Sequence, residues 1–150
     1  MVLNDLYSRL DENNITTFEQ YIPDAKAATI EIRNRYAVFL DRHKIDLETD
    51  ELCILAHEIG HIETGATHRL YSPYELIEQH EYKANAWAIR QLMPKAEVMY
   101  AAACGIRECW DLAEYFSVTE EFAAAAYEYY MRDEYFFQFV MHLKTEDEIL

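Results

Sequence analysis

The chain has 150 residues, of which 13 are Lys or Arg and 28 are Asp or Glu, and its formal net charge at pH 7 is −15. This length is typical of one domain, and a 51% share of hydrophobic residues excludes a disordered acidic tail. The negative charge argues against direct binding of nucleic acid or an anionic membrane, because neutralising phosphate groups requires Lys and Arg. We therefore expect a globular protein with neither of these partners.

The N-terminal segment resembles neither a signal peptide nor a transit peptide, since Asp5 introduces a charge and no continuous apolar stretch follows. No segment approaches the roughly 18 apolar residues of a membrane span. The three cysteines, Cys53, Cys104 and Cys109, include no CxxC pair, which argues against a disulfide scaffold and a cysteine-built zinc site. These features predict a cytoplasmic protein with buried free thiols.

The first elements in chain order are a short helix and a β-hairpin. The pattern predicts a helix over 3–13, which ends at two asparagines. Segments 28–33 and 36–40 alternate or run apolar on either side of residues 34–35, which is typical of a hairpin. This hairpin is the one convincing strand signal in the chain.

Long helices follow. One begins near Asp50, has acidic residues in its first turn, and is expected to stop at Gly65. The next has Ser72 as predicted N-cap, Pro73 at its first position and Glu75 in a capping box, and it runs to about residue 93, before Pro94. Two or three more helices are expected over about 95–104, 106–116 and 119–143.

Together these elements predict a mostly helical α+β fold in a single domain over residues 1–150. Residues 1–94 would form the core that carries the chemistry, and residues 95–150 a helical extension. With only three Gly and three Pro in the chain, helices should dominate.

The chemistry is carried by an HExxH motif over His57–His61, inside the first long helix. Residues four apart point from one face of a helix, so both imidazoles can hold one zinc ion. Glu58 then lies beside the open coordination position, where it can accept a proton from water. Gly60 costs helix stability, about 1 kcal/mol relative to Ala, which suggests that another backbone or a ligand packs closely there.

A catalytic zinc site of this kind needs a third protein ligand. His68 is a weak candidate, because the metzincin pattern HExxHxxGxxH places its glycine and third histidine one residue earlier than they occur here. Glu81, on the second long helix, is the preferred candidate. A carboxylate there can reach the zinc, and with the polar Asn85 one turn later it can also orient one of the histidines. Glu78 and His80 remain alternatives.

The segment AHEIGH over 56–61, followed about twenty residues later by EYKANAWAIRQLMP over 81–94, resembles the ImmA/IrrE family of metallopeptidases. Lys83, Trp87 and Gln91 depart from the family's usual pattern, but none of them is a proposed ligand. The resemblance implies a zincin-like metallopeptidase core, with His57, His61 and Glu81 as Zn²⁺ ligands, Glu58 as general base and Asn85 as a residue that supports a ligand.

The segment 112–122 also has the pattern of a helix-turn-helix. Its second helix would begin Glu120-Glu121 and offers no Lys or Arg before Arg132, so phosphate contact is not expected there. We expect these helices to pack within the protein.

The resemblance implies that the substrate is a helix-turn-helix repressor of a phage or mobile element, cleaved to relieve repression. The alternative is a zinc-containing regulatory protein that binds a repressor or another protein without cleaving it.

A peptidase also needs a hydrogen-bond donor for the oxyanion that forms during the reaction. The candidates in or after the inter-helix loop are Tyr71, Tyr74, His68 and His80, and the pattern does not choose among them.

Overall fold

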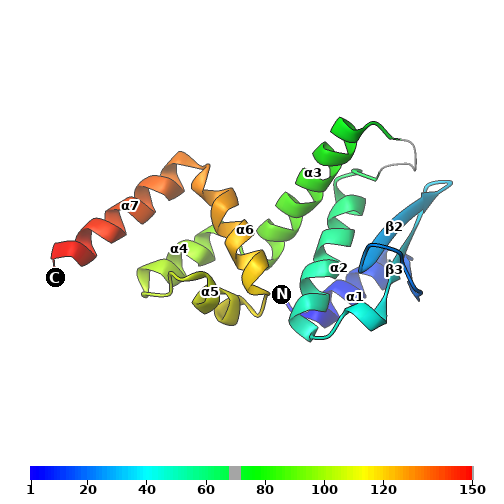
Figure 1. Ribbon diagram of the computed structural model, residues 1–150, viewed down its shortest axis with the longest axis horizontal. Helices are drawn as coiled ribbons and strands as arrows, with labels where there is room; N and C mark the ends of the chain where they lie inside the picture. Colours follow the sequence, from blue (N-terminus) through cyan, green and yellow to red (C-terminus); the bar gives the residue numbers. More distant parts are fainter. Residues whose placement is uncertain (68–71, 150) are drawn as a thin grey trace. The chain divides into compact units, whose positions relative to one another are not determined.

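The computed structural model describes residues 1–67 and 72–149, without the side chains of 148 and 149 (Figure 1). The chain divides into two compact units, Met1–Gln91 and Leu92–Leu150. That boundary lies close to the expected one at residue 94, and the assignment of both parts to one domain stays a prediction. The elements are α1 (Leu3–Glu12), β1 (Thr16–Glu19), β2 (Ala27–Ile32), β3 (Arg35–Leu40), a 3-10 turn η1 (Arg42–Lys44), α2 (Glu48–Glu63), α3 (Tyr74–Leu92), α4 (Lys95–Ala103), α5 (Cys109–Phe116), α6 (Glu120–Met131) and α7 (Glu134–Ile149).

The first unit contains a three-stranded mixed sheet with the order β1-β3-β2. The expected hairpin is present as β2 and β3, which pair antiparallel with Ile32 opposite Arg35. Its turn lies at Arg33 and Asn34, one residue earlier than expected, and the positive φ angles of 51° and 60° are those of a type I′ turn. Strand β1 pairs parallel with β3 and was not predicted, because four residues without alternation give little signal.

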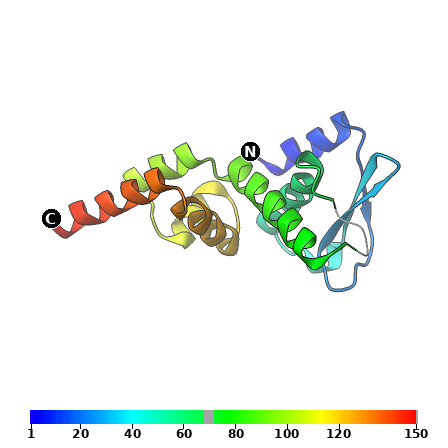
Figure 2. The ribbon, with the colours of Figure 1, turned by 90° about the horizontal axis from the view of Figure 1, so that it is seen from above.

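One face of the sheet packs against helices, as Figures 1 and 2 show for α2 and the strands. Val38 and Leu40 of the central strand β3 are buried on this face. They share the core with apolar side chains of the first two helices, namely Leu6, Leu10, Leu55 and Ile59. The mostly helical α+β fold expected from the sequence is therefore confirmed, and its core is placed directly beneath the HExxH helix.

Helix α2 begins at Glu48, two residues before the expected start, and ends at Glu63. Gly65 follows in the left-handed conformation, with φ 61°, and confirms the expected stop. The amide of Gly65 bonds to the carbonyl of Ile62 at 3.1 Å, and the amide of Ala66 bonds to that of His61 at 2.9 Å. This pair of bonds is a Schellman motif, which fixes the position of Ala66 relative to the last turn.

Arg9 of α1 links the two long helices of the first unit. Its guanidinium lies 2.8 Å from the carboxylate of Glu63 and 5.2 Å from the centre of the Trp87 ring. A cation over an aromatic face is attracted by the ring's negative charge distribution. Trp87, one of the departures from the family pattern, therefore has a specific partner here.

A second polar group joins α1, η1 and α2. Arg42 lies 2.6 Å from the carboxylate of Glu51 and donates to the hydroxyl of Tyr7 at 2.9 Å, while that hydroxyl donates to Glu51. Burial and the hydrogen bond to Glu51 raise the pKa of Tyr7 to about 12. The group holds the first helix against the beginning of α2.

The second unit consists of α4 to α7, and its helix pattern corrects the prediction of one helix over 119–143. The structure has α6 and α7 there, with a break at Arg132 and Asp133. The Asp133 carboxylate accepts from the amide of Phe136 at 2.9 Å and so caps the start of α7. Phe136 is buried, and the Tyr130 hydroxyl donates to the carbonyl of Met93 at 2.7 Å.

Helices α5 and α6 are joined by Ser117, which has a φ of 55°, and by Thr119, whose hydroxyl accepts from the amide of Phe122 at 3.1 Å. The three cysteines carry free thiols, but the expectation that they are buried holds for Cys53 alone, since Cys104 is exposed at the end of α4 and Cys109 is half-buried. No described helix is long and apolar enough to cross a membrane.

Candidate metal centre

His57 and His61 lie four residues apart on α2 and point from the same face, as the motif requires. Their Nε2 atoms are 3.1 Å apart. The side chain of His57 is 23% exposed and that of His61 is 7% exposed, so the pair opens to solvent on the His57 side. The helix therefore presents two imidazole nitrogens at one point.

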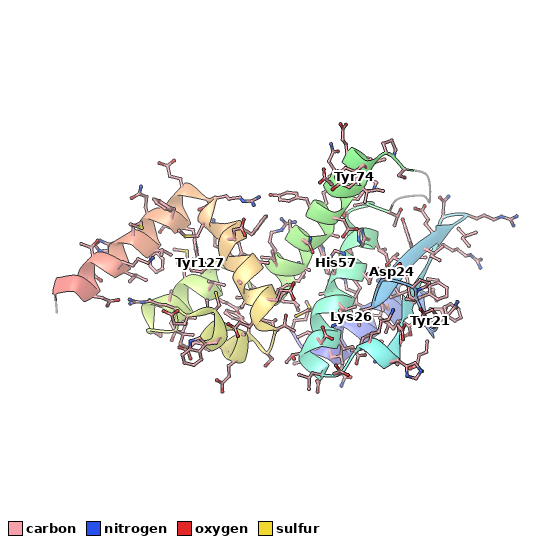
Figure 3. The ribbon with its side chains drawn as sticks, in the orientation of Figure 1. Tyr21, Asp24, Lys26, His57, Tyr74 and Tyr127 are labelled. Carbon is pink, nitrogen blue, oxygen red and sulfur yellow. The ribbon has the colours of Figure 1, made fainter. Side chains whose placement is uncertain are left out.

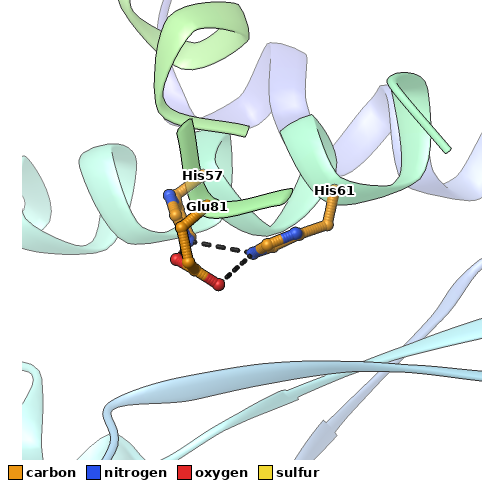
Figure 4. A group of neighbouring side chains, drawn as sticks. All are labelled: His57, His61 and Glu81. Carbon is orange, nitrogen blue, oxygen red and sulfur yellow. Dashed lines mark hydrogen bonds and ion pairs between the residues drawn. The ribbon is translucent and has the colours of Figure 1, made fainter. Parts of the chain in front are cut away.

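Glu81 of α3 approaches the same point from the other helix (Figure 4). Its carboxylate oxygens lie 3.1 Å from Nε2 of His57 and 3.2 Å from Nε2 of His61. Ligand atoms bound to one tetrahedral zinc at about 2.0–2.1 Å are about 3.3 Å apart, so these separations fit a single small cation. These three residues form the one group of His, Cys, Asp or Glu side chains in the described residues with metal-ligand spacing.

Each histidine is oriented by a hydrogen bond at its other ring nitrogen. Nδ1 of His57 lies 2.7 Å from Oδ1 of Asn85, and Nδ1 of His61 lies 2.9 Å from the carbonyl oxygen of Ala66. A carbonyl oxygen only accepts, so Nδ1 of His61 is the donor and, in the neutral ring, its Nε2 carries a lone pair. Asn85 fixes His57 in the same way. Lone pairs from both rings thus converge with a carboxylate, an arrangement that a cation stabilises.

The electrostatics of the group agree with this chemistry. When the two rings are protonated, Nε2 of His57 and of His61 donate to the Glu81 carboxylate, and these hydrogen bonds hold the pKa of Glu81 well below its ordinary value, against the opposing effect of burial. Burial alone lowers the pKa of His61, but bonds to Glu81 and the Ala66 carbonyl, with the charges of Glu81 and Glu58, raise it above its ordinary value. Negative charge is therefore concentrated where a cation would sit.

Glu58, the expected general base, is buried, with 6% of its surface exposed, and it meets the sheet. The hydroxyl of Thr29, on β2, donates to Oε2 of Glu58 at 2.6 Å. Oε1 has no hydrogen-bond partner among the residues that the structure describes. The carboxylate is thus held by one oxygen while the other remains able to take a proton.

Gly60 allows α2 and α3 to approach closely enough to build this group. A Cβ atom at residue 60 would lie 2.5 Å from the carbonyl oxygen of Ala84 and 3.0 Å from its Cα. The expectation that another backbone packs against this glycine is confirmed. Ala84 lies between Glu81 and Asn85 in the sequence of α3. The close contact between Gly60 and Ala84 therefore sets how far both side chains lie from His57.

Glu78 and His80, the alternative ligands on α3, do not belong to the group of three. Glu78 instead bonds to the Tyr74 hydroxyl and raises its pKa, and Tyr74 is exposed at the start of α3 (Figure 3). That helix begins at Tyr74, one residue after the expected start, with the Pro73 carbonyl accepting from the first turn. His68 and Tyr71 lie outside the described residues.

Two contributors to the site were not identified from sequence, Thr29 and the carbonyl of Ala66. The alternation of β2 carried a signal for the first, because Thr29 lies opposite the buried Val38 and so faces the core side of the sheet. A polar side chain at such a position calls for a buried partner. No side-chain pattern marks a backbone carbonyl such as that of Ala66.

A comparison with protein families returned a match over residues 10–128 to the M78 peptidases, under the description IrrE N-terminal-like domain. No curated protein matches the chain. The matched range includes the HExxH helix, Glu81 and Asn85, together with the sheet that holds Thr29. This range exceeds half of the sequence, so the chain belongs to the M78 peptidase family.

Proposed function

We propose that this protein is a zinc endopeptidase in which His57, His61 and Glu81 hold the metal. The observation that carries the proposal is the convergence of two Nε2 atoms and a carboxylate within 3.1–3.2 Å. Two imidazoles and one carboxylate are typical donors for a catalytic zinc, which keeps a further position open. Membership in a peptidase family supports the same activity.

Bound zinc would lower the pKa of water and polarise a peptide carbonyl. The protein's own part of the reaction rests on Glu58, whose Oε1 would accept a proton from the attacking water and later deliver it to the leaving amine. Thr29 holds the other oxygen, at 2.6 Å, and so limits rotation of the carboxylate. Asn85 and the Ala66 carbonyl keep the two imidazoles oriented.

The edge strand β2 supports binding of an extended peptide. It pairs with β3 on one side, and its Thr29 reaches Glu58. An extended segment added along its other side would gain main-chain hydrogen bonds and pass close to the general base. Binding by strand addition favours a substrate segment that is locally unfolded, as at a loop or a domain boundary.

We further propose that the substrate is a helix-turn-helix repressor of a phage or mobile element, and that the reaction takes place in the cytoplasm. The resemblance to the ImmA/IrrE family suggests this class. The charge of −15 is compatible with it, because an acidic surface steers a basic DNA-binding protein toward it. The acidic residues that begin α6, Glu120 and Glu121, agree with a chain that binds no nucleic acid directly.

The test combines metal analysis with cleavage of a helix-turn-helix repressor of a phage or mobile element, with and without chelator. We expect one equivalent of zinc and a discrete fragment that chelator abolishes. Glu58→Gln should retain zinc and lose cleavage, whereas Glu81→Ala should lose zinc. Glu78→Ala, three residues earlier on α3, is the matched control and should change neither.

Two results would reject parts of the proposal. If the wild type and Glu58→Gln regulate the repressor equally without cutting it, the chain is a zinc-containing binding protein, the alternative function. If cleavage of the repressor is insensitive to salt between low and physiological ionic strength, electrostatic steering is wrong.

A further inference from the structure

The three-stranded sheet has an apolar outer face, opposite the one that packs on the helices. The strand register places eight side chains on it, two from β1 and three each from β2 and β3. They are Thr16, Phe18, Ala28, Ile30, Ile32, Arg35, Ala37 and Phe39. None of the eight is acidic, although 28 of the chain's 150 residues are Asp or Glu. We call this set the outer face.

Strand β2 has its polar side chains on the helix side and its apolar side chains on the outer face, the reverse of a strand with one face in solvent. Its Thr29 and Glu31 point to the side of Glu58 and α2, whereas Ile30 and Ile32 point outward. Ile30 is 45% exposed, Ile32 66% and Phe18 46%, while Phe18 stacks on Phe39 with ring centres 5.2 Å apart. Solvated sheet faces normally carry polar side chains, so a contiguous apolar face indicates a binding surface.

The charges beside the outer face identify the kind of partner. Arg35 lies on it opposite Ile32, and Arg33 lies at the adjoining turn. Along residues 1–67 and 72–91, the basic side chains without any ion pair or hydrogen bond are Arg33, Arg35 and Lys83, so two of the three lie here. Arg33 also holds a φ of 51°, a conformation that Asn or Gly adopts more readily.

We propose that the outer face binds an amphipathic helix of another protein, with its apolar side chains on Ile30, Ile32 and the Phe18–Phe39 pair and its carboxylates on Arg33 and Arg35. The two arginines attract acidic groups locally, although the rest of this acidic protein repels them. This surface faces away from Glu58, so the proposal goes beyond the proposed peptidase function and does not depend on it.

The probe is a synthetic helix of about 18 residues, long enough to be helical in isolation, with leucines on one face and glutamates on the other. A peptide of the same pattern with lysines in place of glutamates is its counterpart. We expect the acidic peptide to bind the full chain about tenfold more tightly than the basic one. Amide resonance shifts should concentrate at Ala28, Ile30, Ile32 and Phe39.

The variants separate the two parts of the surface. Arg33→Glu with Arg35→Glu should reverse the preference between the peptides, and Ile32→Ser should weaken binding of both by about tenfold. The matched controls are Lys83→Glu, which changes the third unpaired cation, and Leu47→Ser, which removes another apolar side chain, 67% exposed. Both controls should bind as the wild type does.

A preference for the basic peptide, no binding of either peptide, or equal effects of the outer-face and control variants would overturn the proposal. Sedimentation analysis of the free protein tests whether a second copy of the chain binds the outer face instead. Self-association that Ile32→Ser abolishes would assign the face to a second copy of the chain instead. A monomeric wild type that binds the acidic peptide supports the proposal.

Discussion

The carbonyl oxygen of Ala84 lies where a methyl group on residue 60 would have to go, 2.5 Å from the position of a Cβ atom. This contact joins the helix that carries both histidines to the helix that carries Glu81 and Asn85. The metal-ligand spacing therefore depends on a residue that offers no ligand atom.

Gly60→Ala is expected to separate α2 from α3 and to displace Glu81 and Asn85 from His57. Overpacking of this kind costs about 1–3 kcal/mol of folding free energy. Zinc affinity should fall by at least about tenfold, since ligand positions must be held within about 0.5 Å. Urea unfolding and zinc titration measure the two effects.

Gly105→Ala is the control for that variant. Gly105 has a φ of 93° and no atom near the position of an added Cβ, so the substitution strains the backbone of the second unit. It should lower stability and leave zinc affinity unchanged. Equal zinc affinity in Gly60→Ala and the wild type would show that the close helix contact does not set the site.

Asn85→Leu is expected to weaken zinc binding by about 10–100-fold, the usual effect of losing a group that orients a ligand. The substitution removes the acceptor 2.7 Å from Nδ1 of His57 and leaves the ring free to rotate. Asn85→Asp keeps an acceptor at the same place and should retain the affinity. Competition with a chromogenic chelator gives the constants. If both variants bind zinc as the wild type does, Asn85 does not orient His57.

The parts of the site that follow from local geometry could be predicted from the sequence. His57 and His61 share a face because a helix repeats every 3.6 residues, and Gly65 ends that helix because it adopts a positive φ. Glu81 was the preferred third ligand from spacing, because Asn85 follows one turn later, but spacing alone also admitted Glu78 and His80, and the resemblance to a family strengthened the choice.

The remaining contributors depend on tertiary placement. Thr29 donates to Glu58 because the fold packs strand β2 against helix α2. Ala66 contributes its backbone carbonyl oxygen, which every residue type has, so its identity in the sequence gives no sign of this role. The division of the predicted last helix was missed for a related reason. Asp133 can continue a helix or cap a new one, and the burial of Phe136 in the second unit accompanies the cap.

Asp41→Asn is expected to lower stability at neutral pH. The buried Asp41 carboxylate accepts from the amides of Ile22 at 3.1 Å and His43 at 3.2 Å, and it pairs with Lys44. The hydrogen bond from Ile22 has the largest effect on the pKa of Asp41, which lies below its ordinary value although burial opposes the shift.

A carboxylate whose pKa is lower in the folded state stabilises the protein above the unfolded-state pKa, and this stabilisation is lost as the pH falls through the folded-state value. The wild type should therefore lose its advantage over Asp41→Asn as the pH falls below about 4, the ordinary pKa of Asp. Urea unfolding across this range measures the difference. Asp11→Asn, at an exposed position, is the control and should leave the free energy of unfolding nearly unchanged. A stability difference between the wild type and Asp41→Asn that stays constant with pH would refute the charge effect.

Thr29→Val tests whether the sheet positions the general base. The substitution keeps the shape of the side chain and removes the hydroxyl that donates to Glu58 Oε2 at 2.6 Å. On a substrate that the wild type cleaves, kcat should fall by up to about 100-fold, the cost of misplacing a reacting group by about 1 Å. KM and zinc affinity should change little, because neither the metal ligands nor the edge of β2 is altered. Thr29→Ser should restore most of kcat, whereas Thr17→Val, on β1, should leave it unchanged. A rise in KM together with losses of kcat and zinc affinity would instead identify Thr29 as a residue needed for folding.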